Sequence, residues 1–293
     1  MDFRKIAFIC DKCSWPELDP SKADVSIDVK SSEPPVYVML LADTHLLGTR
    51  RGHWFDKLRR EWQMYRAFQT SMSLHSPDLV FILGDVFDEG LWSSDQEFNS
   101  YVARFHSLFE VPHGTGRHVV VGNHDIGFHY GISPYLQERF ASAMDAPSVQ
   151  MLSVRGVHFV LVNSMAMEDR LKCSKGITKC KKVQKLAQYS KPILLQLLDW
   201  LQPRVIATGH THHGCHKIHR QDAHEWTVPS FSWRNKNNPS FLLTVFAPNN
   251  YAVKKCFMPT ESTVIYIYLF GMIILIGLLT TCSHKRWRHF KRS

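Results

Sequence analysis

The chain has 293 residues, of which 44% are hydrophobic and 21% are charged. This composition allows one large domain or two ordinary ones with a substantial core, and it excludes a disordered chain. The formal net charge of +9 is concentrated, because eight Lys or Arg lie in residues 170–191 and five in residues 283–293, with no acidic residue in either segment. The remainder has 22 basic and 26 acidic residues, so no broad basic groove for nucleic acid is expected.

The first 35 residues are polar and contain four prolines, a composition that predicts a loose N-terminal arm. Their short apolar piece, residues 6–9, is too brief for a signal-peptide core or a membrane span. Cys10 and Cys13 form an isolated C-x-x-C with no second pair at zinc-site spacing, which is weak support for metal or redox chemistry.

From residue 36 the pattern changes to apolar runs that end in polar residues. Runs of four to seven buried residues predict interior strands of a covered sheet. Four segments follow this design: VYVMLLADTH, DLVFILGDVFD, HVVVGNHD and RVIATGHTH. Three more are predicted strands, with no helix between the last two, which favours a second sheet facing the first: GVHFVLVNS, EWTVPSFSW and SFLLTVFAP.

Amphipathic stretches lie between these strands, so the sequence predicts an α/β layered domain over residues 36–260. Apolar residues recur at helical spacing in two of the stretches, and we expect both stripes to face the core. The first stripe is Trp54, Leu58, Trp62 and Tyr65, and the second is Phe98, Val102, Phe105 and Phe109.

Residues 263–282 are twenty residues without a charge, about 30 Å of helix at about 1.5 Å per residue, which matches a hydrocarbon core. A helix buried in a domain is disfavoured because the run is terminal and basic residues follow it at once. A GPI-attachment signal is disfavoured because such signals end in the apolar stretch, whereas this chain ends in SHKRWRHFKRS. We predict a single C-terminal transmembrane helix with a basic cytosolic-type tail over residues 283–293.

The basic segment 170–191 is most simply a solvated loop. The alternative is contact with anionic lipid headgroups or with a phosphate of the substrate. Cys173 and Cys180 flank part of this segment, and they can pair in an oxidising compartment.

Polar side chains close four of the predicted strands, at the edge where open α/β sheets place their ligands. Carboxylates and imidazoles buried at strand ends need partners, and a metal supplies them. Asp, Asn and His ligands without thiolates suit Mn²⁺, Fe or Zn²⁺, and two ions could share Asp85, beside which Gly84 allows a tight turn. The collected residues are Asp43, His45, Asp85, Asp88, Asn123, His124, Asp125, His210 and His212.

The blocks DTH, GDVFD, GNHD and GHTH, in this order, resemble the signature of the calcineurin-like metallophosphoesterases. The resemblance implies a two-sheet sandwich flanked by helices and two divalent metal ions. In that arrangement the first metal is held by Asp43, His45 and His212, Asp85 bridges, and the second metal is held by Asn123 and His210. It further implies that His124 is the acid that assists the leaving oxygen, that Asp125 orients it, that Asp88 lies behind the ligands, and that His213 is a surface neighbour.

Further blocks, including ADTHLLG, KLRREWQM, GNHDIGFHY and PSFSWRNKNNPSF, resemble the membrane-bound branch of this family. That branch removes a side-chain ethanolamine phosphate from GPI anchors. The resemblance implies Mn²⁺ as the metal and GPI-anchored proteins as the substrates. It further implies that the protein is located in the membranes of endoplasmic reticulum exit sites, the intermediate compartment and the Golgi, and that it supports cargo transport between them. Trp233 and Arg234 are candidates to stack on and pair with a sugar phosphate.

The sequence departs from the family pattern in two places. The family places one more second-metal histidine between GNHD and GHTH, but here KPILLQ runs straight from Gln196 into Leu197, and His158 lies in a different predicted strand. The resemblance also leads us to expect an N-terminal signal-anchor, and none is found. Both gaps are typical of a splice variant or an incomplete gene model, and we expect weak or no catalysis from this form.

Three functions therefore stay open at the level of sequence. The first is a dimetal phosphodiesterase acting on a membrane glycolipid, and the second is a catalytically impaired membrane protein that binds GPI glycan or a cargo partner. The third, a nuclease of the same superfamily, is disfavoured by the predicted span. The excess of basic residues in the tail places the domain in the lumen, whereas a terminal span without an N-terminal signal would leave it in the cytosol.

Overall fold

The computed structural model describes residues 13–24, 33–127, 132–165, 198–219, 223–234 and 237–290, with side chains up to residue 282. Several sequence predictions lie outside these residues. They are the basic segment 170–191, the pairing of Cys173 with Cys180, the role of Cys10 and the Gln196–Leu197 junction.

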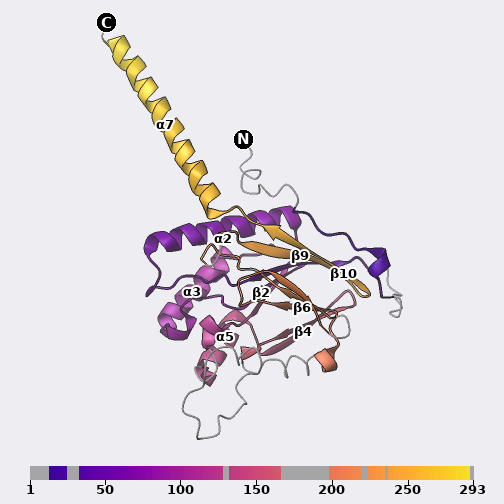
Figure 1. Cartoon of the computed structure of the whole chain (residues 1–293). Coiled ribbons are helices and arrows are strands. Elements are labelled where there is room, and N and C mark those ends of the chain that lie inside the picture. The colour runs from indigo at the N-terminus through magenta and orange to yellow at the C-terminus, as the bar shows by residue number, and fades with distance from the viewer. Residues whose placement is uncertain are drawn as a thin grey trace.

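A central sheet of five strands has the order β10-β9-β1-β2-β3 (Figure 1). Neighbours β1, β2 and β3 pair in parallel, while β9 pairs antiparallel with both β1 and β10. The three parallel strands therefore deliver their carboxyl ends to one edge, where the polar blocks follow them. The strands are β1 (Val36–Ala42), β2 (Leu79–Leu83), β3 (Gly116–Val120), β9 (Ser240–Ala247) and β10 (Asn250–Phe257).

A second layer covers one face of this sheet. Alternate β1 residues, among them Val38 and Leu40, pack in one apolar cluster with Val157 and Leu161 of the second layer. The predicted sandwich of two layers is therefore confirmed, with the second layer split into a hairpin and a three-stranded sheet. The hairpin is β4 (Val149–Val154) and β5 (Val157–Val162), and the sheet is β6 (Val205–Thr208), β8 (His224–Thr227) and β7 (Cys215–Ile218).

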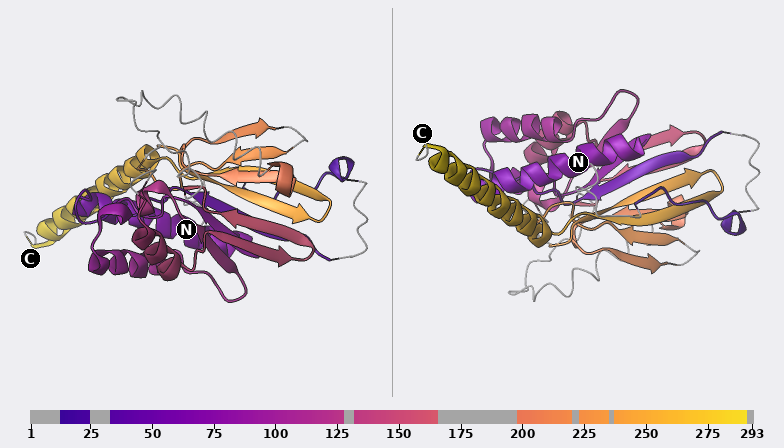
Figure 2. Two further views of the ribbon diagram at one scale, coloured as in Figure 1. Left: turned by 90° about the horizontal axis from the view of Figure 1, so that it is seen from below. Right: turned by 90° about the horizontal axis from the view of Figure 1, so that it is seen from above.

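Helices cover the other face of the central sheet (Figures 1 and 2). Met39 and Leu41, the β1 residues that alternate with those of the first cluster, pack in the larger apolar cluster beneath these helices. Two short helical turns, η2 (Gly90–Trp92) and α4 (Asn123–Ile126), follow the strand ends, whereas η1 (Pro20–Lys22) lies beside the turn between β9 and β10 (Figure 1). The longer helices are α2 (Trp54–His75), α3 (Asp95–Leu108) and α5 (Pro134–Met144).

The two apolar stripes differ in where they point. In α3 the predicted core stripe is confirmed, since Phe98 and Phe105 are fully buried. In α2 the prediction is wrong, because Trp54 is 69% exposed and Leu58 61% exposed, and Trp62 and Tyr65 are exposed as well. The core-facing residues of α2 are instead found mostly in its C-terminal half: Gln63, Met64, Phe68, Ser71, Met72 and His75.

Part of the N-terminal segment is fixed to the domain, which corrects the expectation of a loose arm for residues 13–24. Cys13 forms a disulfide with Cys256 of β10, with Cα atoms 5.4 Å apart. Trp15 packs edge-on against Tyr37, with ring centroids 4.9 Å apart, and its indole N–H donates to the carbonyl of His75. A covalent link and a packed indole therefore hold this segment against β10 and the end of α2.

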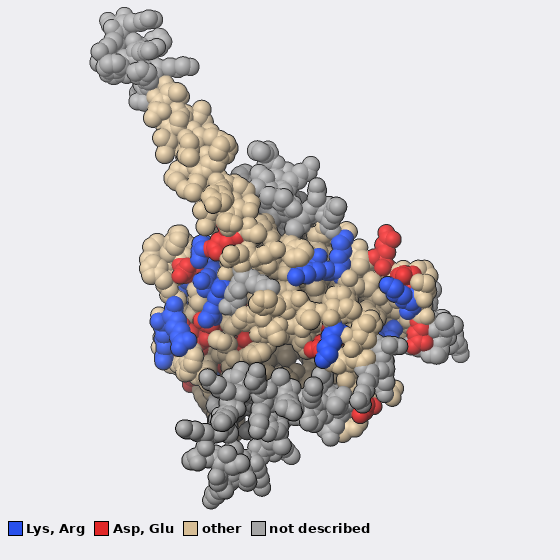
Figure 3. All heavy atoms as spheres, in the orientation of Figure 1, with Lys and Arg blue, Asp and Glu red and all other residues tan. Residues whose placement is uncertain are grey.

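Helix α7 (Glu261–Phe290) leaves the domain as a single rod (Figure 1). The segment from Glu261 to Cys282 has a mean hydropathy of 2.3, is long enough to cross a membrane, and is not covered by any described part of the domain. Beyond Glu261 the helix forms a column in Figure 3 without Lys, Arg, Asp or Glu, above a base where charges of both signs gather. Its length and its lack of protein cover make α7 a candidate for the membrane-spanning helix predicted from the sequence.

Candidate metal centre

The strand-end residues adopt strained backbone conformations. Among the described residues nine non-glycine residues have positive φ, and five of them belong to the predicted site: Asp43, His45, Asp85, His210 and His212. Such conformations persist only where the surrounding structure enforces them, and they cluster at functional sites. The turns after β1, β2 and β6 thus aim these groups at one point.

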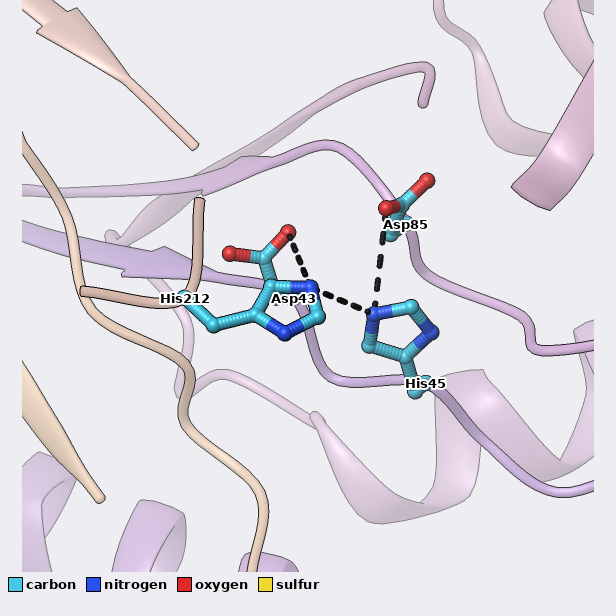
Figure 4. Close-up of side chains that lie close together, drawn as sticks. All are labelled: Asp43, His45, Asp85 and His212. Carbon is cyan, nitrogen blue, oxygen red and sulfur yellow. Dashed lines mark hydrogen bonds and ion pairs between the residues drawn. The ribbon is translucent and has the colours of Figure 1, made fainter. Parts of the chain in front are cut away.

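Four side chains converge there, Asp43, His45, Asp85 and His212 (Figure 4). Their ligand atoms all lie within 4.8 Å of one another. The Nε2 atoms of His45 and His212 are 3.3 Å apart, and His45 Nε2 is 3.7 Å from Asp85 Oδ2. His212 Nε2 lies 4.0 Å from Asp43 Oδ1. Two carboxylates and two imidazoles around one point form a donor set that suits a divalent transition metal.

Glycines in the same blocks make this convergence possible. Gly84 has φ +71, a conformation that a side chain would strain. A Cβ at Gly122 would lie 2.3 Å from Asp85 Oδ1 and 2.0 Å from the Asp85 backbone nitrogen. The glycines of GDVFD and GNHD therefore let two strand ends approach each other with Asp85 between them.

The protonation states fit a metal site. Burial lowers the pKa of His45 to about 3, and burial together with the nearby His45 lowers the pKa of His212 to about 4, so both imidazoles are neutral ligands at neutral pH. Burial, reinforced by the charge of Asp85, raises the pKa of Asp43 to about 8, so without a cation this group holds a proton at neutral pH that a bound metal ion would displace. Asp43 Oδ2 is buried with no hydrogen-bond partner, so this oxygen is free to take a cation.

A second group of side chains surrounds Asp88, next to the cluster described above. Asp88 Oδ1 is 3.4 Å from His45 Nδ1 and 3.2 Å from His124 Nδ1, and it forms an ion pair with Arg234. The Arg234 guanidinium balances the charge of Asp88. The hydrogen bond that orients His124 joins its Nδ1 to the main-chain carbonyl of Asp88 at 3.1 Å. Asp88 thus positions His124 and lies beside His45, which agrees with its expected place behind the ligands.

Asp125 does not orient His124, which corrects the role that the family resemblance implied. Its carboxylate accepts three main-chain hydrogen bonds instead, from Val86 at 3.2 Å, from Phe87 at 2.8 Å and from Gly122 at 2.8 Å. Asp125 is therefore a brace that ties the turn after β2 to the turn after β3.

The candidate ligands of a second metal, Asn123 and His210, lie at the edge of the cluster. His210 is exposed, and its main-chain N–H donates to Asp43 Oδ1 at 3.0 Å. Asn123 is half-buried as the first residue of α4. His158 is exposed on β5 and contacts Ser153, so it does not replace the missing ligand. Their roles in a second site stay predictions.

The two candidate substrate residues, Trp233 and Arg234, have different surroundings. Trp233 is buried and its indole N–H donates to the carbonyl of Pro259 at 3.2 Å, so the expectation that it stacks on a sugar is wrong. Arg234 is half-buried at the cluster, with Nη1 3.3 Å from His45 Nδ1. The structure thus adds two features that the sequence reading lacked, the pairing of Arg234 with Asp88 and the brace formed by Asp125.

Residues 36–227 match the sequence profile of the calcineurin-like phosphoesterases. The chain belongs to this family. It is 41% identical to Metallophosphoesterase 1 of Xenopus laevis over 92% of this chain and 83% of that protein. It is 38% identical to the Metallophosphoesterase 1 homolog of Drosophila melanogaster over 95% of this chain and 89% of the relative.

The alignment with the Xenopus relative runs over 342 positions, more than the 293 residues of this chain, so the relative has residues without a counterpart here. The chain is also similar to a solved dimetal phosphatase from Danio rerio, with 12% identity over 78% of this chain and 100% of that one and a TM-score of 0.47. Membership of the family makes the chain a metallophosphoesterase that uses divalent metal.

Proposed function

We propose that this chain is a membrane-attached phosphodiesterase that uses Mn²⁺ to remove a side-chain ethanolamine phosphate from GPI anchors. The buried cluster of Asp43, His45, Asp85 and His212 carries the proposal, because two carboxylates and two neutral imidazoles around one point suit metal-assisted hydrolysis. Helix α7 supports a lipid-linked substrate, since it keeps this cluster at a bilayer. The specific substrate is supported by the motifs that resemble the membrane-bound branch of the family.

The roles of the side chains follow from their contacts. Asp43, His45, Asp85 and His212 would hold a divalent cation, which lowers the pKa of water and neutralises phosphate charge. His124 is held at Nδ1 by Asp88, so its Nε2 is the nitrogen that can give a proton to the leaving oxygen. Arg234, fixed by Asp88, adds positive charge where a phosphate would enter.

We infer that the domain faces the lumen of the secretory pathway. The disulfide between Cys13 and Cys256 is typical of an oxidising compartment. The basic residues that follow the span favour a cytosolic tail, which leaves the domain on the opposite side of the membrane. Membranes between the endoplasmic reticulum and the Golgi, with GPI-anchored cargo as substrate, are the location that we propose.

A direct assay tests the proposed reaction. The full chain, reconstituted in vesicles with Mn²⁺, is given a GPI-anchored reporter, and released ethanolamine phosphate is measured by mass spectrometry. We expect release that depends on Mn²⁺ and is lost in Asp85→Ala. Release that continues unchanged in Asp85→Ala would overturn the assignment of this cluster as the reaction centre.

One observation favours a second function, that of a catalytically impaired membrane protein that binds GPI glycan or cargo. The sequence has no histidine between His158 and His210, where the family places a ligand of the second metal. Loss of outer groups around a metal costs about 10–100-fold in affinity or activity, and loss of a direct ligand costs at least as much. Elemental analysis of the purified chain separates the two functions, because two ions per chain favour the enzyme and one ion favours the binding protein.

A further inference from the structure

The apolar stripe on the N-terminal half of α2 has no protein cover. Trp54, Leu58, Trp62 and Tyr65 are all exposed, and at about 100° per residue they fall within an arc of roughly 80° on one side of the helix. Four large apolar side chains in one line are more than the single exposed residues that any surface shows, so they mark a surface that binds something apolar.

This stripe lies at the foot of the membrane-spanning helix. Figure 1 shows α2 lying across the face from which α7 rises, and the view from above in Figure 2 places both helices on that same face. Two side-chain contacts join them. Arg59 forms an ion pair with Glu261 in the first turn of α7, and the rings of Trp62 and Tyr268 approach edge to face with centroids 6.1 Å apart.

These contacts fix the depth of α2 relative to a bilayer. Tyr268 is seven residues along α7 from Glu261, about 10 Å of helix, and helical side chains lean back toward the N-terminus. The Tyr268 ring therefore lies near the level of the headgroups, where membrane proteins concentrate Trp and Tyr. Trp62 touches that ring, so the stripe of α2 reaches the same level.

The composition of α2 fits a helix that lies in the plane of a membrane surface. Beside the stripe it carries four Lys or Arg and two acidic residues: Lys57, Arg59, Arg60, Arg66, Asp56 and Glu61. Trp and Leu on one face with Lys and Arg beside them is the pattern of interfacial helices, whose apolar side enters about 5–10 Å into the boundary between headgroups and acyl chains.

We propose that the Trp54–Tyr65 half of α2 docks on the lipid surface of the bilayer that holds α7. A spanning helix alone lets a domain swing about its base, whereas a second line of contact fixes the face that the domain turns to the membrane. The occupant of the stripe is lipid and not a second protein, because the stripe is continuous with the anchor and at headgroup depth. The proposal rests on the membrane attachment in the proposed function and not on the substrate.

Tryptophan quenching by brominated lipid tests this contact. The full chain is reconstituted in phosphatidylcholine vesicles with brominated or ordinary acyl chains, and the difference in tryptophan emission is recorded. The double variant Trp54→Phe/Trp62→Phe removes two reporters but keeps the apolar stripe. Because indole rings settle at headgroup level, we expect its quenched signal to be about twofold smaller than that of the wild type. Trp200→Phe removes another exposed tryptophan, outside α2, and should leave the quenched signal unchanged.

A pair of matched variants tests whether the stripe itself makes the contact. Leu58→Glu places a charge on the stripe, and Leu74→Glu places the same charge on the same helix, about 160° away and also at an exposed leucine. We expect Leu58→Glu to abolish the quenching of Trp54 and Trp62, and Leu74→Glu to leave it intact. Unfolding in detergent controls for folding, and both variants should stay within about 0.5 kcal/mol of the wild type there, as surface changes do.

Three results would overturn the proposal, and they are distinct. Failure of the chain to float with vesicles after an alkaline wash would refute both membrane attachment and docking. Flotation with equal quenching in the wild type and the double Phe variant would refute docking alone. Quenching absent in the wild type, together with dimers in nanodiscs that Leu58→Glu dissociates, would assign the stripe to a second copy of the chain.

Discussion

Helices α2 and α3 carry the same sequence pattern and use it in opposite ways. Each has four large apolar residues at helical spacing. In α3, Phe98 and Phe105 are fully buried and pack against Phe87, with ring centroids 5.4 Å and 6.3 Å from it. In α2, Trp54 and Trp62 are exposed, and Trp62 approaches Tyr268 of α7. Periodicity thus predicts which face of a helix avoids water, but not whether a core or a bilayer receives it.

The composition of the two stripes differs in a way that is informative. The α3 stripe is made of Phe and Val, which carry no polar group. The α2 stripe contains Trp54, Trp62 and Tyr65, whose rings are apolar but carry a polar atom, and such residues are enriched at membrane surfaces. The sequence therefore held a signal for the membrane-facing stripe, and the prediction of a core overlooked it.

The largest expected difference between the stripes is in the free energy of unfolding. Phe105→Ala removes a fully buried ring, so we expect a loss of about 3–5 kcal/mol, whereas Leu58→Ala should cost at most about 0.5 kcal/mol in detergent. Denaturant titration of both variants gives the comparison. Equal losses would contradict the assignment of the two faces.

Stabilisation by a bound metal ion distinguishes the residues of the metal centre from those of the α2 stripe. His45→Ala removes a ligand and should abolish stabilisation by Mn²⁺, which reaches about 2.7 kcal/mol at 100 times the dissociation constant. Leu58→Glu should keep that stabilisation in full, because its side chain is exposed on α2. Thermal unfolding with and without Mn²⁺ measures both. Loss of the metal effect in Leu58→Glu would couple the α2 stripe to the site.

The pH dependence of the stability of the metal-free protein also distinguishes the metal centre from the α2 stripe. Asp43, with its pKa raised to about 8, keeps a proton in the folded state that the unfolded chain has released, so stability falls as pH rises toward 8. Asp125, whose pKa burial and Asp85 also raise to about 8, acts in the same direction. Between pH 6.5 and 8 we expect a loss on the order of 1 kcal/mol per pH unit.

Urea unfolding in a chelator at several pH values measures this slope. Excess Mn²⁺ should remove the part of the slope that Asp43 causes, because the bound cation displaces its proton, and should leave the part that Asp125 causes, because Asp125 is not among the ligands. Leu58→Ala should keep the wild-type slope, since the stripe of α2 has no part in it. A metal-free protein that gains stability over this range would contradict the assignment.

The smallest expected effect concerns how the two helices begin. Ser94 caps α3, with a capping box in which Ser94 and Glu97 satisfy each other's main-chain N–H. Helix α2 is capped by His53, whose ring accepts one hydrogen bond from the Phe55 N–H at 3.3 Å. We expect Ser94→Ala to cost about 1 kcal/mol and His53→Ala less, measured by thermal unfolding. A larger loss of stability in His53→Ala would contradict this ranking of the two helix caps.

Much of the fold and of the site was predictable, for a physical reason. Apolar runs that end in Asp, Asn or His mark strands that deliver ligands to one site, and β1 and β2 do this for Asp43, His45 and Asp85 from one edge of the central sheet. His212 reaches the same site from β6 of the second layer, and the apolar run before it did not show that its strand belongs to another sheet. The sequence could not predict which of several nearby groups a side chain would choose as its hydrogen-bond partner. Asp125 follows His124 directly, yet its carboxylate accepts hydrogen bonds from main-chain N–H groups, because the turn at Gly84 and the close approach that Gly122 allows bring these donors to it.

The turn at residues 233–234 has a mechanical consequence. Trp233 is tied to Pro259, two residues before α7, while its neighbour Arg234 reaches Asp88 and His45. One short piece of chain is thus fastened to the root of the anchor on one side and to the reaction centre on the other. Membranes of unequal thickness tilt a spanning helix by different amounts. A tilt at the root of α7 would therefore act on Trp233 first and, through the adjacent residue, on the Arg234 guanidinium.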